Sequence, residues 1–345
     1  MINVSIIGGT GYVAAELIRI LLKHPYVNIK YVMSSSNANT DISETYKHFK
    51  KKINLSYTEL NYDLLKDSDV IFCCLPHGVS QDIVYNLHHM NKLVIDLSAD
   101  YRYKDINIYN EWYGSHKYPD LFKEAVYGLP ELYRNQIKKS KIIGNPGCYT
   151  TCSILSLAPL LKNKMIEKNN IIIDAKSGVS GAGRKSDFNF SFCETDENFK
   201  AYSIASHRHT SEIEQEYSIL YGNDIKITFT PHLLPIKRGI LCTIYANLVN
   251  KSIAIDAIRE IYLTFYENEY FVRIYNKGEF PEIKYVTGSN FIDIGFAIDK
   301  RTNRIIIVSA IDNLIKGAAG QAVQNMNILL NLDEKTGLDF TGEYF

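Results

Sequence analysis

One cysteine in this 345-residue sequence stands where its thiol could act as a nucleophile. It is Cys148, in the run Gly144-Asn145-Pro146-Gly147-Cys148-Tyr149-Thr150-Thr151, where a Pro-Gly turn leads into an apolar, helix-like segment, Cys152 to Leu161. The N–H groups and dipole at a helix N-terminus favour a thiolate, and they can hold an oxyanion formed when sulfur attacks a carbonyl. The sequence therefore predicts covalent catalysis by Cys148, and inert packing for Cys73, Cys74, Cys152 and Cys242.

Histidine is the usual acid or base partner of a nucleophilic thiol. Of the nine histidines, two lie in His207-Arg208-His209, which has polar neighbours and precedes a helical pattern, so they are the candidates for this partnership. His77, at the end of an expected parallel strand, is a candidate for the cofactor cleft, where such sheets bind ligands. His232 stays open between a structural and a substrate-proximal position, and exposure is expected for His24, His48, His88, His89 and His116.

A glycine-rich turn near the start of the chain predicts a dinucleotide site. In Gly8-Gly9-Thr10-Gly11-Tyr12-Val13-Ala14, the residues from Gly9 fit G-x-G-x-x-A, directly between an expected strand and an expected helix. Glycines there let the backbone approach a pyrophosphate, which the N–H groups of the helix N-terminus hold. The residues expected to bind cofactor are therefore Gly9, Thr10, Gly11, Tyr12 and Val13.

The end of the second expected strand indicates which dinucleotide binds. NAD recognition uses a carboxylate about 20 residues after the glycines, on the ribose 2′-hydroxyl. This chain has Ser34-Ser35-Ser36 instead, and no carboxylate before Asp41. Hydroxyl and N–H groups accept a 2′-phosphate, so the sequence favours NADP(H). The alternative is that these serines simply begin a loop.

A second glycine-rich loop, Ser177-Gly178-Val179-Ser180-Gly181-Ala182-Gly183-Arg184, follows a later β-rich run. It has two interpretations of equal weight. The loop either closes over a cofactor and positions an anion through Arg184, or is a plain hairpin.

The elements that position these residues follow two patterns. Up to residue 100, strand-like and helix-like segments alternate, as in an open, doubly wound parallel sheet of Rossmann type; we expect strands at 3–7, 27–33, 69–75 and 92–97 and helices at 13–23 and 79–90. From about residue 147, long β-rich runs indicate an α+β domain with a mostly antiparallel sheet. There we expect strands at 171–176, 225–230, 240–249, 291–298 and 304–310, and helices at 212–220, 254–266 and 313–330, the last beginning near Asp312.

Composition excludes several classes of function. Thirty-eight basic and 38 acidic residues cancel, so nothing supports a nucleic-acid partner. The longest uncharged run, 142–161, contains Asn145-Pro146-Gly147 and Pro159 and suits a turn and a helix better than a membrane span. The N-terminus lacks the pattern of a signal peptide, and no CxxC pair suggests zinc. We expect a cytoplasmic protein with reduced thiols, no metal and no membrane partner.

Seven motifs fall in order along nearly the whole chain: GGTGYVAAEL near the start, LPHG at 75–78, DLSADYR at 96–102, GNPGCYTT, SGVSGAGR, HRH and DNLIKGAAGQAVQN. Together they resemble the N-acetyl-gamma-glutamyl-phosphate reductase family of arginine biosynthesis, which is related to aspartate-semialdehyde dehydrogenase. The resemblance implies that residues 1–147, completed by a helix at 312–332, bind NADP(H). It implies that residues 148–311 carry the substrate site and the interface of a homo-oligomer, a dimer or a tetramer.

The resemblance also implies roles for single residues. Cys148 would be the nucleophile and His207 the acid or base, with His209 close by at the substrate. Arg102 and Arg184 would bind substrate anions, and Asn313 and Gly181 would approach the cofactor.

The implied reaction is the NADPH-dependent reduction of N-acetyl-glutamyl 5-phosphate, a small acyl phosphate, to the 5-semialdehyde and phosphate through a Cys148 thioester. Reductases of aspartyl phosphate or of the aminoadipyl analogue remain alternatives, because one methylene changes binding by only about 1–3 kcal/mol. A non-catalytic NADP-binding regulator is a further alternative, but it would need neither Cys148 beside a turn nor the HRH motif.

Overall fold

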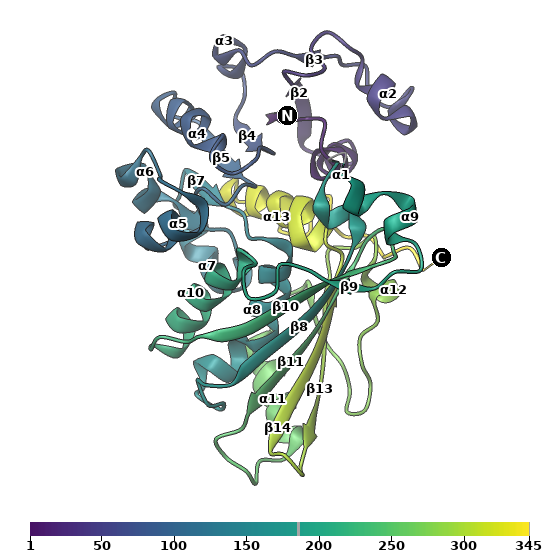
Figure 1. The fold of residues 1–345 in the computed structure, drawn as a ribbon. Coiled ribbons are helices and arrows are strands. Elements are labelled where there is room, and N and C mark those ends of the chain that lie inside the picture. Colours follow the sequence, from purple (N-terminus) through teal and green to yellow (C-terminus); the bar gives the residue numbers. More distant parts are fainter. Residues whose placement is uncertain (185–186, 345) are drawn as a thin grey trace. The chain divides into compact units, whose positions relative to one another are not determined.

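The computed structural model describes residues 1–184 and 187–344. Its contacts divide the chain into two compact units. Unit 1 consists of Met1–Pro146 and Ala318–Asp339, and unit 2 consists of Gly147–Gly317 and the residues from Phe340 on. Figure 1 labels most elements of both units, and each unit is described by itself below.

Unit 1 is built on a seven-stranded sheet with the order β3-β2-β1-β4-β5-β7-β6, in which neighbouring strands run parallel. The strands are β1 (Ile2–Ile7), β2 (Val27–Met33), β3 (Tyr57–Thr58), β4 (Val70–Cys73), β5 (Leu93–Asp96), β6 (Val126–Tyr127) and β7 (Ile142–Gly144). Chain order reverses on either side of β1, so ligands are expected at the carboxyl ends of β1 and β4. The predicted doubly wound parallel sheet is confirmed.

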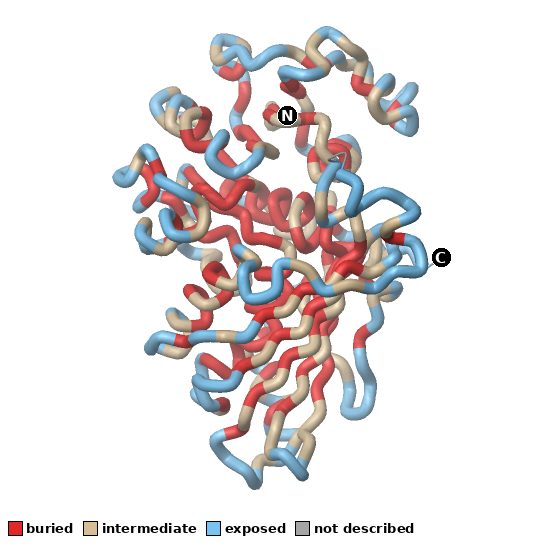
Figure 2. Tube along the Cα trace, in the orientation of Figure 1, coloured by how far each residue is buried: buried red, intermediate tan, exposed pale blue. Residues whose placement is uncertain are grey.

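The helices of unit 1 are α1 (Tyr12–Leu21), α2 (Ile42–Thr45), α3 (Tyr62–Leu65), α4 (Ser80–His89), α5 (Ile106–Tyr113), α6 (Pro119–Glu124), α7 (Pro130–Ile137) and α13 (Gly320–Leu329). Helix α13 packs against α1 and α7 and is buried along its whole length (Figure 2). Its polar side chains have partners inside the unit, since Gln321 and Asn325 both donate to the carbonyl of Gly128.

The single helix expected over 313–330 is wrong at its start. A π-helical turn at Ile315–Ala319 comes first, and regular α13 begins only at Gly320. The backbone N–H of Gly317 donates to the carbonyl of Asp312, five residues back, which makes this turn wider than an α-helical one.

Unit 2 contains a mixed seven-stranded sheet with the order β12-β13-β14-β11-β8-β10-β9. The strands are β8 (Ile171–Gly178), β9 (Lys200–Ala201), β10 (Ile227–Leu234), β11 (Ile240–Asn247), β12 (Val272–Ile274), β13 (Ile292–Asp299) and β14 (Arg304–Ile311). Four of its strand pairs are antiparallel, while β8–β10 and β12–β13 are parallel. The sheet is therefore mostly antiparallel, as predicted.

Helices α8 (Cys148–Lys162), α10 (His209–Tyr221) and α11 (Ile255–Phe265) cover one face of this sheet, and α12 (Ile283–Val286) packs on β14. Alternate strand residues such as Ile173 and Ile244 are buried, while Ile172, Tyr245 and Ile306, on the opposite face, are half-buried.

Helix α8 is buried despite a proline in its interior. Pro159 has no N–H to offer the carbonyl of Leu155, four residues back, and the hydroxyl of Tyr266, the C-cap of α11, donates to that carbonyl instead. This bond, together with one from Tyr262 to the carbonyl of Ser156, fastens α11 to α8 and fixes the helix that begins at Cys148.

Candidate active site

Cys148 is the first residue of α8, and Gly147 is its N-cap, in an extended conformation with φ −69° and ψ 156°. Among the described residues, no side chain caps this helix end. Cys148 is partly exposed, whereas Cys73, Cys152 and Cys242 are buried. Burial raises the pKa of Cys74 to about 12 and that of Cys73 and Cys242 well above the ordinary value. Cys74 is as partly exposed as Cys148, and Cys193 is exposed, so the reactivity of Cys148 over the other cysteines stays a prediction.

Two glycines leave room around Cys148. A Cβ added to Gly317, in the π-helical turn, would come within 2.8 Å of Cys148 Cβ. A Cβ added to Gly147 would lie 2.4 Å from Nε2 of His209, so the His209 ring rests on the backbone immediately before the cysteine. Unit 2 thus brings Cys148 and the His207–His209 segment together.

The structure fixes the tautomer of His207. The backbone N–H of His209 donates to Nδ1 of His207 at 3.1 Å, so the proton of the neutral ring must sit on Nε2. Burial, with a smaller effect from Arg208, lowers the pKa of His207 to about 4, and Glu212 acts in the opposite direction. At neutral pH, His207 is therefore an uncharged Nε2–H donor.

Aromatic rings hold the two histidines. The rings of His207 and His209 lie 4.8 Å apart, and Tyr149, the residue after Cys148, makes edge contacts with both at 5.6 and 6.0 Å. The hydroxyl of Tyr202 donates to that of Tyr149 at 3.1 Å, and Tyr149 donates to the carbonyl of His232 at 3.3 Å. The pKa of Tyr202 rises to about 12, chiefly through burial and also through the nearby Cys148. Sequence reasoning missed both tyrosines.

Nδ1 of His232 lies 3.1 Å from Oδ1 of Asp174 on β8, and the His232 ring contacts the ring of Phe199. This pairing gives the side chain a structural partner in unit 2.

The second glycine-rich loop leaves β8 as a short 3-10 helix, Val179–Ala182. Asn313 holds it, because Asn313 Nδ2 donates to Oγ of Ser180 at 3.0 Å while its Oδ1 accepts the N–H of Gly239 at 2.7 Å. Gly181 and Arg184 are exposed on the loop, and residues 185 and 186 lie outside the described part of the chain.

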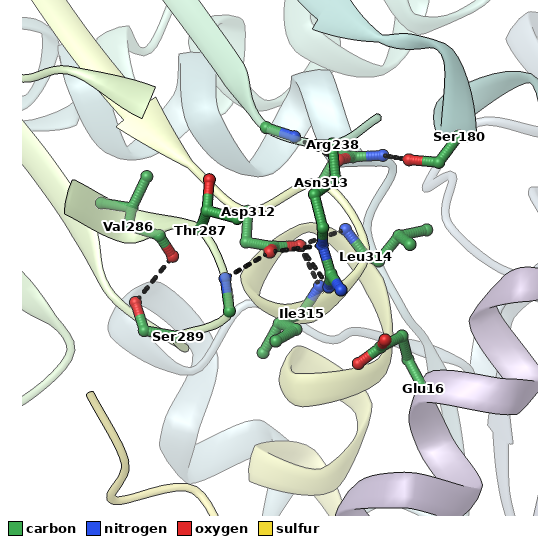
Figure 3. Close-up of polar contacts among 12 residues, drawn as sticks. Glu16, Ser180, Arg238, Val286, Thr287, Ser289, Asp312, Asn313, Leu314 and Ile315 are labelled. Carbon is green, nitrogen blue, oxygen red and sulfur yellow. Dashed lines mark hydrogen bonds and ion pairs between the residues drawn. The ribbon is translucent and has the colours of Figure 1, made fainter. Parts of the chain in front are cut away.

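Figure 3 shows the buried carboxylate of Asp312 beside this contact. It accepts N–H groups from Gly288, Leu314 and Ile315 at 2.7 to 3.0 Å. It also pairs with the guanidinium of Arg238 at 2.8 and 3.0 Å. Sequence reasoning placed a helix start at Asp312 but missed this ion pair.

In unit 1, the first glycine-rich turn has the geometry of a phosphate-binding loop. A Cβ on Gly8, where φ is +85°, would lie 2.3 Å from the carbonyl oxygen of Cys74, and one on Gly9 would lie 2.2 Å from Val32. At Gly11, the N-cap of α1, no described atom would lie within 4 Å of such a Cβ. Thr10 and Val13 are half-buried and Tyr12 is exposed around this opening.

The serines after β2 remain compatible with a phosphate. Ser34 is buried, Ser35 and Ser36 are exposed, and the hydroxyls of Ser34 and Ser36 are 3.2 Å apart. Asp41, the next carboxylate, caps α2 by accepting the N–H of Ser43 at 2.6 Å.

The LPHG and DLSADYR motifs bind each other in unit 1. Both carboxylate oxygens of Asp100 lie 2.9 Å from the backbone N of Gly78, and Asp96 accepts hydroxyls from Ser80 and Ser98. Burial raises the pKa of Asp96 to about 7. His77, next to Gly78, makes an edge contact with the ring of Tyr113.

Arg102 is buried at the end of the DLSADYR motif. Its Nε donates to the carbonyl of Asn145 at 2.7 Å and its Nη2 to the carbonyl of Leu97 at 2.9 Å. The first of these bonds holds the backbone at Asn145, and the second holds the backbone that follows β5.

Comparisons with known proteins first define the class. Residues 3–140 match the family described as semialdehyde dehydrogenase, NAD binding domain, and residues 148–313 match the semialdehyde dehydrogenase dimerisation domain. Aspartate semialdehyde dehydrogenase II of Vibrio cholerae, complexed with ASA, has a TM-score of 0.73 at 17% identity and covers 96% of this chain and 98% of its own. The Candida albicans enzyme with NADP gives 0.70 at 17% identity, with the same coverage. The chain therefore has the fold of the semialdehyde dehydrogenases.

Sequence relatives then narrow this class. The N-acetyl-gamma-glutamyl-phosphate reductase of Caldicellulosiruptor saccharolyticus is 61% identical over 345 residues, and that of Acetivibrio thermocellus is 54% identical over 346 residues, each covering 100% of both chains. The chain belongs to the N-acetyl-gamma-glutamyl-phosphate reductase family, and the resemblance seen in its motifs is confirmed.

Proposed function

We propose that this chain reduces N-acetyl-γ-glutamyl phosphate to N-acetyl-glutamate 5-semialdehyde, with release of phosphate, in arginine biosynthesis. The observation that supports it most is Cys148, partly exposed at the start of α8, in the same unit as a neutral His207 whose Nε2 carries the proton. This pairing of a thiol with an imidazole donor suits acyl transfer to sulfur.

The glycine-rich turn of unit 1 fits NADP(H). The backbone at Gly8 and Gly9 is too closely approached for any side chain, while the N-cap of α1 opens onto space in which a diphosphate could meet the helix N–H groups. Ser34, Ser35 and Ser36 would take the 2′-phosphate, with Asp41 already used as a helix cap. The bound dinucleotide supplies a hydride to the acyl carbon.

The chain's own residues perform the remaining chemistry. The Cys148 thiolate bonds to the acyl carbon, the bond from that carbon to the phosphate oxygen breaks, and phosphate leaves with the electron pair. After reduction of the thioester, the carbonyl re-forms, the C–S bond breaks and its electrons return to Cys148. Nε2–H of His207 would stabilise the oxyanion of each tetrahedral adduct, and the departing phosphate takes up the one proton consumed overall.

Other residues would bind substrate and cofactor. We assign the substrate anions to Arg184 on its exposed loop and to His209 beside Gly147. Gly181 and Asn313 would line the cofactor side of that loop. Arg102 would contribute its positive charge while it holds the carbonyl of Asn145.

Unit 2 offers a surface for a homo-oligomer. The sheet face opposite α8 carries half-buried apolar side chains, among them Ile172, Tyr245 and Ile306. A second copy covering this face would bury them.

Within residues 1–184 and 187–344, each helix falls short of the length and apolarity needed to cross a bilayer. We place the reaction in the cytoplasm.

The test is the reverse reaction, phosphate-dependent reduction of NADP+, run separately with N-acetyl-glutamate 5-semialdehyde, aspartate semialdehyde and the aminoadipate analogue. We expect kcat/KM for the first to exceed that for aspartate semialdehyde by at least about a hundredfold, since a site built to hydrogen-bond the acetyl amide rejects a substrate that lacks it. For the aminoadipate analogue we expect a difference of about tenfold or more, the effect of one methylene. NAD+ should be the poorer cofactor. Equal rates with aspartate semialdehyde, or equal kcat/KM for NAD+, would contradict the assignment.

A further inference from the structure

A buried carboxylate lies at the start of α8. Glu212, in the first turn of α10, is 0% exposed, and its Oε1 accepts the backbone N–H of Gly147 at 3.0 Å. The hydroxyl of Thr150 lies 2.8 Å from the same oxygen and 2.6 Å from the carbonyl of Gly147. A residue of α10 therefore holds both ends of the turn that presents Cys148.

Burying this carboxylate destabilises the folded protein unless other interactions compensate for the lost hydration, so its presence here calls for a function or for strong partners. A buried charge needs hydrogen bonds to offset its loss of hydration. A carboxylate near a helix N-terminus is stabilised by the dipole, and here it lies 3.0 Å from the backbone N of Gly147, the residue before the cysteine that must become a thiolate. Its charge also acts on His207, where it opposes the effect of burial.

We propose that Glu212 is a positioning residue for the reaction of Cys148. Its carboxylate fixes the backbone of Gly147, and its negative charge sets the ionisation of both Cys148 and His207. The inference deepens the proposed function and rests on it only for the effect on turnover. Among the described residues, the charge of Glu212 acts on His207, and Cys148 and Tyr149 follow Gly147, whose backbone N–H Glu212 accepts. Tyr202 bonds to Tyr149, Arg208 and His209 lie between His207 and Glu212 in the chain, and Glu216 lies one turn further along α10.

The experiment compares Glu212→Gln with Glu214→Gln in the full chain, both in a Cys193→Ser background because Cys193 is an exposed thiol. Glutamine retains an oxygen that can accept the N–H of Gly147 and removes the charge. Glu214 is the matched control, since it lies on the same helix and its Oε1 also accepts a backbone N–H, that of Ile227 at 3.1 Å on β10. The readout is the pH dependence of Cys148 alkylation by iodoacetamide, followed by peptide mass mapping.

We expect Glu212→Gln to move the midpoint of alkylation to lower pH by about one unit, because a nearby negative charge no longer opposes the thiolate. Glu214→Gln should leave the midpoint where it is in the parent. Equal midpoints in all three proteins would overturn the inference. This readout requires no substrate, so a protein that shows the shift but reduces no acyl phosphate would refute the proposed function alone.

Glu212→Asp separates the charge from the contact. It keeps the charge but withdraws the oxygen from Gly147 by about one bond length, so we expect a midpoint near that of the parent and kcat lowered about tenfold with KM little changed. This variant also keeps the inference testable if Glu212→Gln does not fold. Parental kcat in Glu212→Asp would overturn the positioning role.

Discussion

Two helix N-termini in this molecule begin alike and are used differently. Gly11 at α1 and Gly147 at α8 are both N-caps in an extended conformation, with φ −81° and ψ 163° and with φ −69° and ψ 156°. Across the described chain, neither end has a side-chain cap. Around Gly11, a Cβ would meet no described atom within 4 Å, whereas at Gly147 it would collide with the His209 ring, and Glu212 takes up the Gly147 N–H.

This difference indicates the function of each helix N-terminus. An N-terminus that opens onto empty space can receive an external anion, which brings its own charge to the dipole. The N-terminus of α8 packs against an imidazole, and a buried carboxylate bonds to its backbone. It is therefore held by the protein's own side chains, and it presents the side chain of Cys148. The first suits a phosphate of the dinucleotide, and the second suits a nucleophile.

The largest effect is expected for a variant at the N-terminus of α8, where Cys148 lies. Cys148→Ser keeps the shape but presents a hydroxyl that is scarcely ionised at neutral pH, so turnover should fall by at least about a thousandfold. Binding of NADPH, measured by fluorescence titration, should stay within twofold of the parent, because the expected dinucleotide loop lies in unit 1. Cys193→Ser, at an exposed thiol, serves as the control and should keep full activity. More than a few per cent of activity in Cys148→Ser would exclude the thioester route.

The next effect concerns the two histidines held against Tyr149. His207→Asn removes the Nε2–H donor and should lower kcat by about 10²–10³-fold, the usual range for loss of one oxyanion-hole donor. His209→Asn should raise KM more than it lowers kcat, as expected for a ring that lines the substrate site. Steady-state kinetics of both variants decide the matter, and the reverse pattern would show that the two roles are exchanged.

A matched pair of glycine variants tests the difference between the N-termini of α1 and α8. Gly147→Ala forces the His209 ring away from the turn, and a displacement of this size next to the nucleophile should lower kcat by about a hundredfold. Gly11→Ala meets no described side chain, so the folded protein should tolerate it, while KM for NADPH rises about tenfold because the methyl group occupies space at the phosphate-binding end. Equal effects of both variants on KM for NADPH would remove the distinction.

Local patterns were enough to predict the frame of both units. The strand over 27–33 is β2, and the apolar segment after Cys148 is the helix α8, with the cysteine as its first residue. The helices α5, α6 and α7 were not predicted. Helices α5 and α6 depend on a cluster of rings, among them Tyr103, Tyr109 and Phe122, that come together only in three dimensions, and α7 packs against the distant helix α13.

The burial of several polar side chains could not be predicted from the sequence. His24 and His116 were expected to be exposed, and this is wrong, because both are buried. The ring of His24 bonds to Asn327, some 300 residues away, and His116 packs on Tyr101 and Tyr109. Glu212 was missed for the same reason, since a glutamate on a helix usually faces water, whereas here Gly147 and Thr150 at the start of α8 bond to it.

The smallest expected effect is on stability in acid. Because the pKa of His207 is lowered to about 4, chiefly by burial, the unfolded chain binds more protons than the folded one between about pH 6.5 and 4. Stability from this group is present above that range and is lost as the pH falls through it, at no more than about 1.4 kcal/mol per pH unit. His24 and His116, whose pKa values burial also lowers, contribute in the same direction in both proteins compared. We therefore expect urea unfolding of His207→Asn to lose about 2 kcal/mol less than the parent between pH 7 and pH 4.5. Parallel losses in the two proteins would show that burial does not lower the pKa of His207.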